Sequence, residues 1–166
     1  MRNVQNVQAI KDECKKQKLL LPTQVAYVLA TVQHETGDTF EPVREAFWVK
    51  NAEAWREANL RYYPYYGRGF VQLTWKTNYQ KYSDILKVDL VSNPDAALDP
   101  VTAAFILVHG FIHGVFTGNK ISDYINATRT DYRAARRCIN GVDRADLIAG
   151  YARAWQSQLA SVPPVP

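Results

Sequence analysis

The sequence predicts a single, mainly α-helical domain with at most a very small β element. The chain has 166 residues, of which 47% are hydrophobic and 22% charged, so it can bury a core of ordinary size. Apolar residues recur at helical spacing along most of the chain, and several segments begin with residues that favour helix starts. Strand signals are weak, and residues 70–73 are the best candidate for a short extended piece.

Two helices are expected near the N-terminus. Val4, Val7 and Ile10 fall on one face of a helix over residues 3–18. Pro22 suits the first turn of a second helix, which runs through an apolar segment to Glu35 before Gly37 stops it.

The middle of the chain combines short helices with a loop. A helix over residues 51–60 can be capped by Asn51. Residues 61–69 contain Pro64, Gly67 and Gly69 and should form a loop. We expect Thr74 to cap the next helix, which extends to Leu86.

Three more helices are expected in the C-terminal half. Asp99 offers a capping oxygen and Pro100 a fixed φ, and the helix that follows is apolar nearly all round until Gly118, which predicts a central core helix. Thr130 should open a helix to Ile139, and Asp143 another to Ala160. Residues 1–166 are interpreted as one domain, with 162–166 as a loose tail.

Composition limits the setting in which the protein works. Two cysteines, Cys14 and Cys138, cannot form a disulfide framework and suit a reducing compartment. The first ten residues lack a signal-peptide core, and the apolar run 19–32 is too short to cross a bilayer. We therefore expect synthesis in a cytoplasm without a signal peptide.

The net charge of +4 is mild and compatible with an anionic partner. Residues 129–153 contain six Arg and three Asp. Arg133, Arg136 and Arg137 are a candidate surface for an anionic wall polymer or lipopolysaccharide, and a solvated helix face is the plain alternative. The sequence contains no known nucleic-acid-binding motif, so no nucleic-acid partner is expected, and a monomer is expected.

Several kinds of chemistry lack their motifs. There is no G-x-S-x-G nucleophile elbow, and Gly67-Arg68-Gly69 is not a phosphate-binding loop. His109 and His113 are four positions apart, but Gly110 stands where a zinc protease needs Glu. Neither a metal nor a cofactor is expected.

Carboxylates remain as candidate catalytic groups. Glu35 ends an apolar helix, and partial desolvation there would favour the protonated form that a general acid needs. Glu45 lies ten positions further on, with Glu41 as a rival second carboxylate. Twelve of the 20 aromatic residues fall within 40–82, and aromatic rings suit a sugar-binding groove. Two carboxylates beside such a groove are typical of a glycosidase.

Three motifs then resemble glycoside hydrolase family 19, the chitinase-like enzymes, and in particular its short phage-type endolysins. They are His34-Glu35-Thr36-Gly37, the long and specific run Y-G-R-G-F-V-Q-L-T over residues 66–74, and Ile139-Asn140-Gly141. The resemblance implies a compact, lysozyme-like helical fold and an inverting two-carboxylate mechanism. It implies Glu35 as the general acid, Glu45 as the general base and Thr74 as the hydroxyl that holds the attacking water. It also implies a substrate groove lined by Tyr66, Arg68, Gln72, Asn78 and Asn140.

The departures from the plant enzymes of that family point to peptidoglycan as the substrate. The stretch between Glu35 and Glu45 is short, Phe70 replaces a frequent Pro, and the cysteines are few. The resemblance therefore implies an endolysin that cleaves β-1,4 bonds of bacterial peptidoglycan after a holin has permeabilised the membrane. A chitinase and a non-catalytic wall-binding module are the alternatives.

Overall fold

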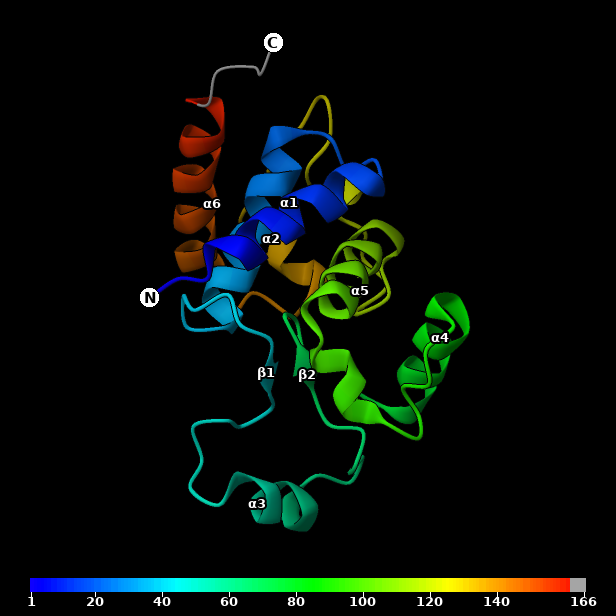
Figure 1. Cartoon of the computed structure of the whole chain (residues 1–166). Coiled ribbons are helices and arrows are strands. Elements are labelled where there is room, and N and C mark those ends of the chain that lie inside the picture. Colours follow the sequence, from blue (N-terminus) through cyan, green and yellow to red (C-terminus); the bar gives the residue numbers. More distant parts are fainter. Residues whose placement is uncertain (162–166) are drawn as a thin grey trace.

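The computed structural model describes residues 1–161 and confirms the mainly α-helical class (Figure 1). A two-stranded antiparallel sheet pairs Val43 with Gly69 and Arg44 with Arg68. The α-helices are α1 (Val4–Lys16), α2 (Pro22–Glu35), α3 (Ala52–Asn59), α4 (Lys76–Leu86), α5 (Pro100–His113) and α6 (Ala145–Ala160). The strands are β1 (Val43–Arg44) and β2 (Arg68–Gly69), and the 3₁₀ segments are η1 (Pro94–Leu98), η2 (Ile121–Asp123) and η3 (Ala134–Cys138).

The main core lies between α1, α2, α5 and α6. Helices α2 and α6 run side by side, and α1 packs on α5 (Figure 1). Tyr27 of α2 lies at the centre, with its ring edge-on to Phe111 and stacked on Tyr132 at centroid distances of 6.0 and 6.1 Å. Cys14 and Cys138 are buried in the same core, and burial raises the pKa of both thiols to about 12, so neither is an active nucleophile.

The sheet links this core to the outlying part of the molecule. In Figure 1 the two short strands lie between the main helical body and α3. A second, smaller core joins α4, η1 and α5 through Tyr79, Tyr82, Ala97 and Ile106. Gly69 in β2 has a φ of +103°, a backbone conformation that favours glycine at this position of the strand.

The start of α4 differs from the sequence prediction. Residues 70–73 do not form a strand, and only Leu73 makes a single bridge, to Arg68. Thr74 does not cap α4: its hydroxyl donates to the carbonyl oxygen of Gln72, and the helix begins at Lys76 after Trp75, whose φ is +75°. Trp75 therefore occupies the cap position, and Thr74 stands one residue before it.

Three further boundaries also differ. Helix α5 begins as predicted, with the Asp99 side chain accepting from the Thr102 amide, but it ends at His113 because Gly114 adopts a φ of +67°. Residues 130–139 hold only the 3₁₀ segment η3 instead of an α-helix. Helix α6 begins at Ala145, after Arg144 in a left-handed conformation, so Asp143 is not its cap.

The loose tail expected at 162–166 lies outside the described residues. Within residues 1–161, no helix combines the length and apolar character needed to cross a membrane.

Candidate active site

Glu35 ends α2, and its side chain is only 19% exposed. Its Oε1 atom accepts a 2.9 Å hydrogen bond from Nη1 of Arg136, whose side chain is 4% exposed. Arg136 also donates through Nε to the carbonyl oxygen of Asp143 at 3.0 Å. The guanidinium therefore fixes the Glu35 carboxylate against the segment that follows η3.

A pocket of about 310 Å³ opens beside this ion pair. It brings together the end of α2, the residues before and within the first turn of α4, and the segment around η3. Its lining residues include Glu35, Gln72, Thr74, Trp75, Asn78, Phe116, Arg136 and Asn140. Four of the residues that the sequence analysis assigned to the site thus lie together with Glu35: Gln72, Thr74, Asn78 and Asn140.

Hydrogen bonds hold the polar wall of this pocket in place. Asn78 donates through Nδ2 to the carbonyl oxygen of Thr74 at 2.9 Å, and Thr74 donates to that of Gln72 at 2.9 Å. Gln72 in turn donates to the carbonyl oxygen of Val43 in β1 at 3.3 Å. The Thr74 hydroxyl oxygen can still accept a hydrogen bond, so the wall can bind and orient a water or a sugar hydroxyl.

A smaller pocket of about 130 Å³ lies on the other side of Glu35. It shares Glu35 and Gln72 with the first pocket and adds Arg44, Phe47 and Trp48. The rings of Phe47 and Trp48 are exposed and meet edge to face at 5.2 Å, with Trp48 75% exposed. Glu35 therefore lies where two pockets join, and exposed aromatic surface flanks one of them.

Glu45 lies just after β1 and does not line either pocket. Its Oε1 accepts a 2.6 Å hydrogen bond from the Tyr62 hydroxyl, and its Oε2 accepts from the Gly67 amide at 2.9 Å. The Tyr62 ring packs against that of Trp75, with 4.9 Å between the ring centroids, and Trp75 lines the pocket of about 310 Å³. Tyr62 thus connects Glu45 to the wall of the Glu35 pocket.

Glu41 lies in a different setting. Its carboxylate accepts hydrogen bonds from the side chains of Asn3 at 2.7 Å and Asn6 at 3.3 Å. Both partners stand at the start of α1, so Glu41 joins the N-terminal helix to the loop before β1. Of the two candidates for the second carboxylate, Glu45 alone contacts the segment 61–75.

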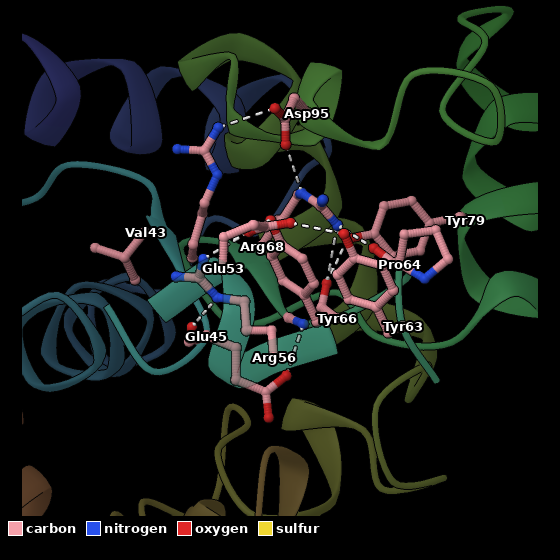
Figure 2. A network of polar contacts seen from close by, with 12 residues as sticks. Val43, Glu45, Glu53, Arg56, Tyr63, Pro64, Tyr66, Arg68, Tyr79 and Asp95 are labelled. Atoms are coloured by element: carbon pink, nitrogen blue, oxygen red, sulfur yellow. Dashed lines mark hydrogen bonds and ion pairs between the residues drawn. The ribbon is translucent and has the colours of Figure 1, made fainter. Parts of the chain in front are cut away.

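Tyr66 and Arg68 are buried and line neither of the pockets beside Glu35. Figure 2 shows them in a polar network with Glu53, Asp95 and Tyr79. The Arg68 guanidinium lies 3.7 Å from the centroid of the Tyr66 ring and donates to the Tyr79 hydroxyl at 3.0 Å and to Asp95 at 2.8 Å. They border a third, more open pocket of about 600 Å³ together with Arg44, Glu53, Arg56 and Asp95.

Charged neighbours shift the pKa values of both acids in this network. Burial alone would raise the pKa of Glu53, but hydrogen bonds from Tyr63, Arg56 and Tyr66 outweigh it and hold the pKa below its usual value. Burial alone would also raise the pKa of Asp95, but the hydrogen bonds and charges of Arg44 and Arg68 outweigh it and hold the pKa below its usual value. Both carboxylates are therefore ionised at neutral pH.

Arg136 corrects one element of the sequence analysis. The sequence predicts a basic surface of Arg133, Arg136 and Arg137, but the burial of Arg136 against Glu35 removes its charge from that surface. Arg133 is exposed and pairs with Asp146, and Arg137 is exposed, so binding of an anionic polymer by these two stays a prediction.

Sequence reasoning missed three contributors to the site region. Arg136 is 101 positions from Glu35, and no local pattern connects the two. Glu53 and Arg44 look like ordinary surface charges in the sequence. The one signal that could have found them is the density of tyrosines at 62–66, because tyrosine hydroxyls need partners when they are partly buried.

Comparison with known proteins relates this arrangement to one family. Residues 25–119, more than half of the chain, match the glycoside hydrolase family 19 profile described as chitinase class I. The chain is 61% identical over 41 residues to chitinase 11 of Oryza sativa subsp. japonica, which is 24% of this chain and 16% of that protein. It is 34% identical over 83 residues to an acidic endochitinase of Petunia hybrida, or 49% of this chain and 32% of that protein. These matches thus span less than a third of each curated relative.

Two solved structures share the fold. A bacterial family 19 chitinase, described with differences from plant enzymes, superposes with a TM-score of 0.60 over 99% of this chain and 89% of its own, at 20% identity. Chitinase C from Streptomyces griseus HUT6037 gives a TM-score of 0.55 over 93% of this chain and 64% of its own, at 23% identity. The family match and the shared fold agree with the motif resemblance, and the chain belongs to glycoside hydrolase family 19, the class I chitinase family.

Proposed function

We propose that this protein hydrolyses β-1,4 glycosidic bonds of bacterial peptidoglycan by two-carboxylate acid–base catalysis. The observation that carries the proposal is the position of Glu35 at the junction of two pockets, held by Arg136 and faced by Thr74 and Asn78. Glycoside hydrolysis uses a pair of carboxyl groups that flank the bond to be cleaved, and Glu35 is proposed as one of them.

The roles that we propose for the side chains are those that the motif resemblance implies. Glu35 donates a proton to the leaving glycosidic oxygen. Glu45 accepts a proton from the attacking water, which the Thr74 hydroxyl and Asn78 amide orient through hydrogen bonds. Attack from the opposite face of the sugar inverts the anomeric centre. Asn140, at the rim of the same pocket, is placed to bind the acetamide or a hydroxyl of the substrate.

Two features support peptidoglycan as the substrate. The chain between Glu35 and Glu45 is short, so the site has few loops to enclose an extended neutral strand. The small pocket beside Glu35 is also lined by Arg44, whose charge suits a glycan with carboxylate groups. Chitin is the second candidate, because the curated relatives and solved neighbours are named as chitinases.

The experiment compares the wild-type protein with Glu35→Gln, Glu45→Gln and the matched control Glu41→Gln. Purified peptidoglycan and chitin oligomers are digested in parallel, and mass spectrometry identifies the products. The proposal expects muropeptides with new reducing ends from wild type and Glu41→Gln, and a loss of at least about 100-fold in the other two variants. Full activity of Glu35→Gln and Glu45→Gln would refute the mechanism. Products from chitin alone would establish the second candidate, and wall binding without any product would indicate a binding module.

The cellular route is part of the same proposal. The protein would accumulate in a host cytoplasm and reach the wall after a holin opens the inner membrane. Expression in a Gram-negative host should leave cells intact until the membrane is permeabilised with chloroform, after which turbidity should fall. Lysis without permeabilisation would contradict this route.

A further inference from the structure

We propose that Arg44 recognises a carboxylate on the substrate and so distinguishes peptidoglycan from uncharged chitin. This inference rests on the proposed function and adds a specificity determinant to it. Arg44 lines both the small pocket beside Glu35 and the larger pocket of about 600 Å³. It therefore lies where the two pockets meet, and a glycan that passes Glu35 can reach it.

The larger pocket carries a surplus of positive charge. Three arginines line it (Arg44, Arg56 and Arg68), against two carboxylates (Glu53 and Asp95). Glu53 pairs with Arg56 at 2.9 Å, while Asp95 alone serves both Arg44 at 2.9 Å and Arg68 at 2.8 Å. One guanidinium charge in this pocket is thus left without a carboxylate of its own, and one more anionic group would balance the three arginines.

The donors of Arg56 and Arg68 are committed within the protein. Arg68 is 5% exposed and bonds through Nε to Asp95 and through Nη1 to the Pro64 carbonyl and the Tyr79 hydroxyl. Arg56 is also buried, and its Nε donates to the Glu45 carbonyl oxygen. Figure 2 shows both side chains enclosed by this network, with Asp95 at one end. Neither guanidinium can turn toward a ligand without breaking several hydrogen bonds.

Arg44 differs from both. Its side chain is 43% exposed, and it is bonded to Asp95 through a single nitrogen, Nη2. A guanidinium has five N–H donors in a planar fork that matches a carboxylate, so most of its capacity remains for a ligand. Pairing of Arg44 with Arg68 in the sheet fixes its backbone, one residue before Glu45. The position is therefore rigid, whereas the charged end is accessible.

The chemistry of the two glycans makes this position selective. Chitin carries only hydroxyl and acetamide groups, whereas the stem peptides of peptidoglycan carry free carboxylates. A hydrogen bond between two charged groups contributes more to binding than a neutral one. An anionic substituent at Arg44 would thus favour peptidoglycan, and a neutral strand would gain nothing from this residue.

The test measures kcat/KM of wild type, Arg44→Gln and Arg44→Lys on three substrates: native peptidoglycan fragments, the same fragments with amidated carboxylates, and chitin oligomers. The control is Arg2→Gln, which lies before α1, breaks an exposed pair with Asp38 and lines none of the three pockets described above. We expect Arg44→Gln to lose about tenfold or more on native fragments and nothing on the other two. Arg44→Lys should recover part of the loss. Thermal unfolding of each variant checks that the fold is kept.

Equal losses of Arg44→Gln on charged and uncharged substrates, or no loss on native fragments, would overturn the inference. The proposed function fails in a different way, namely if wild type releases no muropeptides. In that case, binding of soluble native and amidated fragments to Glu35→Gln, with and without Arg44→Gln, still decides the role of Arg44. Affinity that is the same for all four combinations would refute carboxylate recognition.

Discussion

Arg136 and Glu35 form a 2.9 Å ion pair across 101 residues of sequence, with the arginine side chain almost fully buried. The pair joins the C-terminal end of α2 to η3 and forms one wall of the pocket in which the proposed acid lies. A carboxylate whose orientation depends on a single distant guanidinium ties the activity of the site to the packing of that segment.

Replacing Arg136 by Gln should therefore lower both activity and stability. Loss of one partner from a buried pair costs up to about 3–5 kcal/mol, and the partial exposure of Glu35 places this variant toward the lower part of that range. We expect a reduced melting temperature in thermal unfolding and a loss of kcat that substrate saturation does not restore. The matched control is Arg133→Gln, which breaks an exposed pair with Asp146 and should change little. Similar behaviour of the two variants would contradict a positioning role for Arg136.

The Tyr62 hydroxyl should orient Glu45. Burial and the hydrogen bond to Glu45 raise the pKa of Tyr62 to about 12, so the phenol remains a donor throughout the pH range of an assay. Tyr62→Phe removes a hydrogen bond to a charged acceptor and should lower kcat roughly tenfold. Tyr65→Phe, which loses a hydrogen bond only to the Val91 carbonyl oxygen, is the control and should retain activity. Unchanged kcat in Tyr62→Phe would exclude this role.

The hydroxyl of Tyr27 is buried without a hydrogen-bond partner among residues 1–161. An unsatisfied buried polar group is costly, so Tyr27→Phe should leave stability unchanged or raise it by up to about 1–2 kcal/mol. Chemical denaturation measures the difference. The Tyr82 hydroxyl, in contrast, contacts Nδ1 of His109 at 3.0 Å. The Tyr82→Phe variant should therefore be less stable than wild type by about 1 kcal/mol. A clear loss of stability in Tyr27→Phe would show that the hydroxyl is satisfied in solution.

His109 should make the fold sensitive to acid. Burial, aided by the charges of His113 and Lys81, lowers the pKa of His109 from 6.5 to about 4. The unfolded chain binds a proton at His109 below about pH 6.5 while the folded protein does not, so this residue reduces stability progressively as the pH falls from about 6.5 to 4. His109→Gln should flatten the decline of the melting temperature in that window. His113→Gln should keep most of the decline, since burial is the larger cause, and an equal effect of both variants would contradict this assignment.

The helical framework could largely be predicted from local signals. The starts of α2 and α5 follow from Pro22 and from Asp99-Pro100, whose effects on the backbone act within one turn. The predictions failed where a local signal had a local competitor. Trp75 takes the cap position of α4 in place of Thr74, and Gly114 ends α5 one turn before Gly118.

The candidate site could likewise be predicted from the sequence only in part. Gln72, Thr74 and Asn78 are close in sequence and lie together on one wall of the Glu35 pocket. Tyr66 and Arg68 belong to the same motif, yet their side chains lie in a separate, buried network because β2 and the turn after it direct them toward Asp95 and Tyr79. Motif membership alone therefore does not place a side chain in the site.

The sequence by itself determined the helical class, the position of Glu35 at a helix end and the motifs of glycoside hydrolase family 19. These properties depend on periodicity, helix caps and short motifs, which act over a few residues. Only the tertiary structure decided that Arg136 pairs with Glu35, that Glu45 is held by Tyr62 and Gly67, and that Arg44 keeps an accessible charge between two pockets. The reason is physical: hydrogen bonds and ion pairs form between groups that the packing of distant segments brings within about 3 Å, and this proximity has no local signature in the chain.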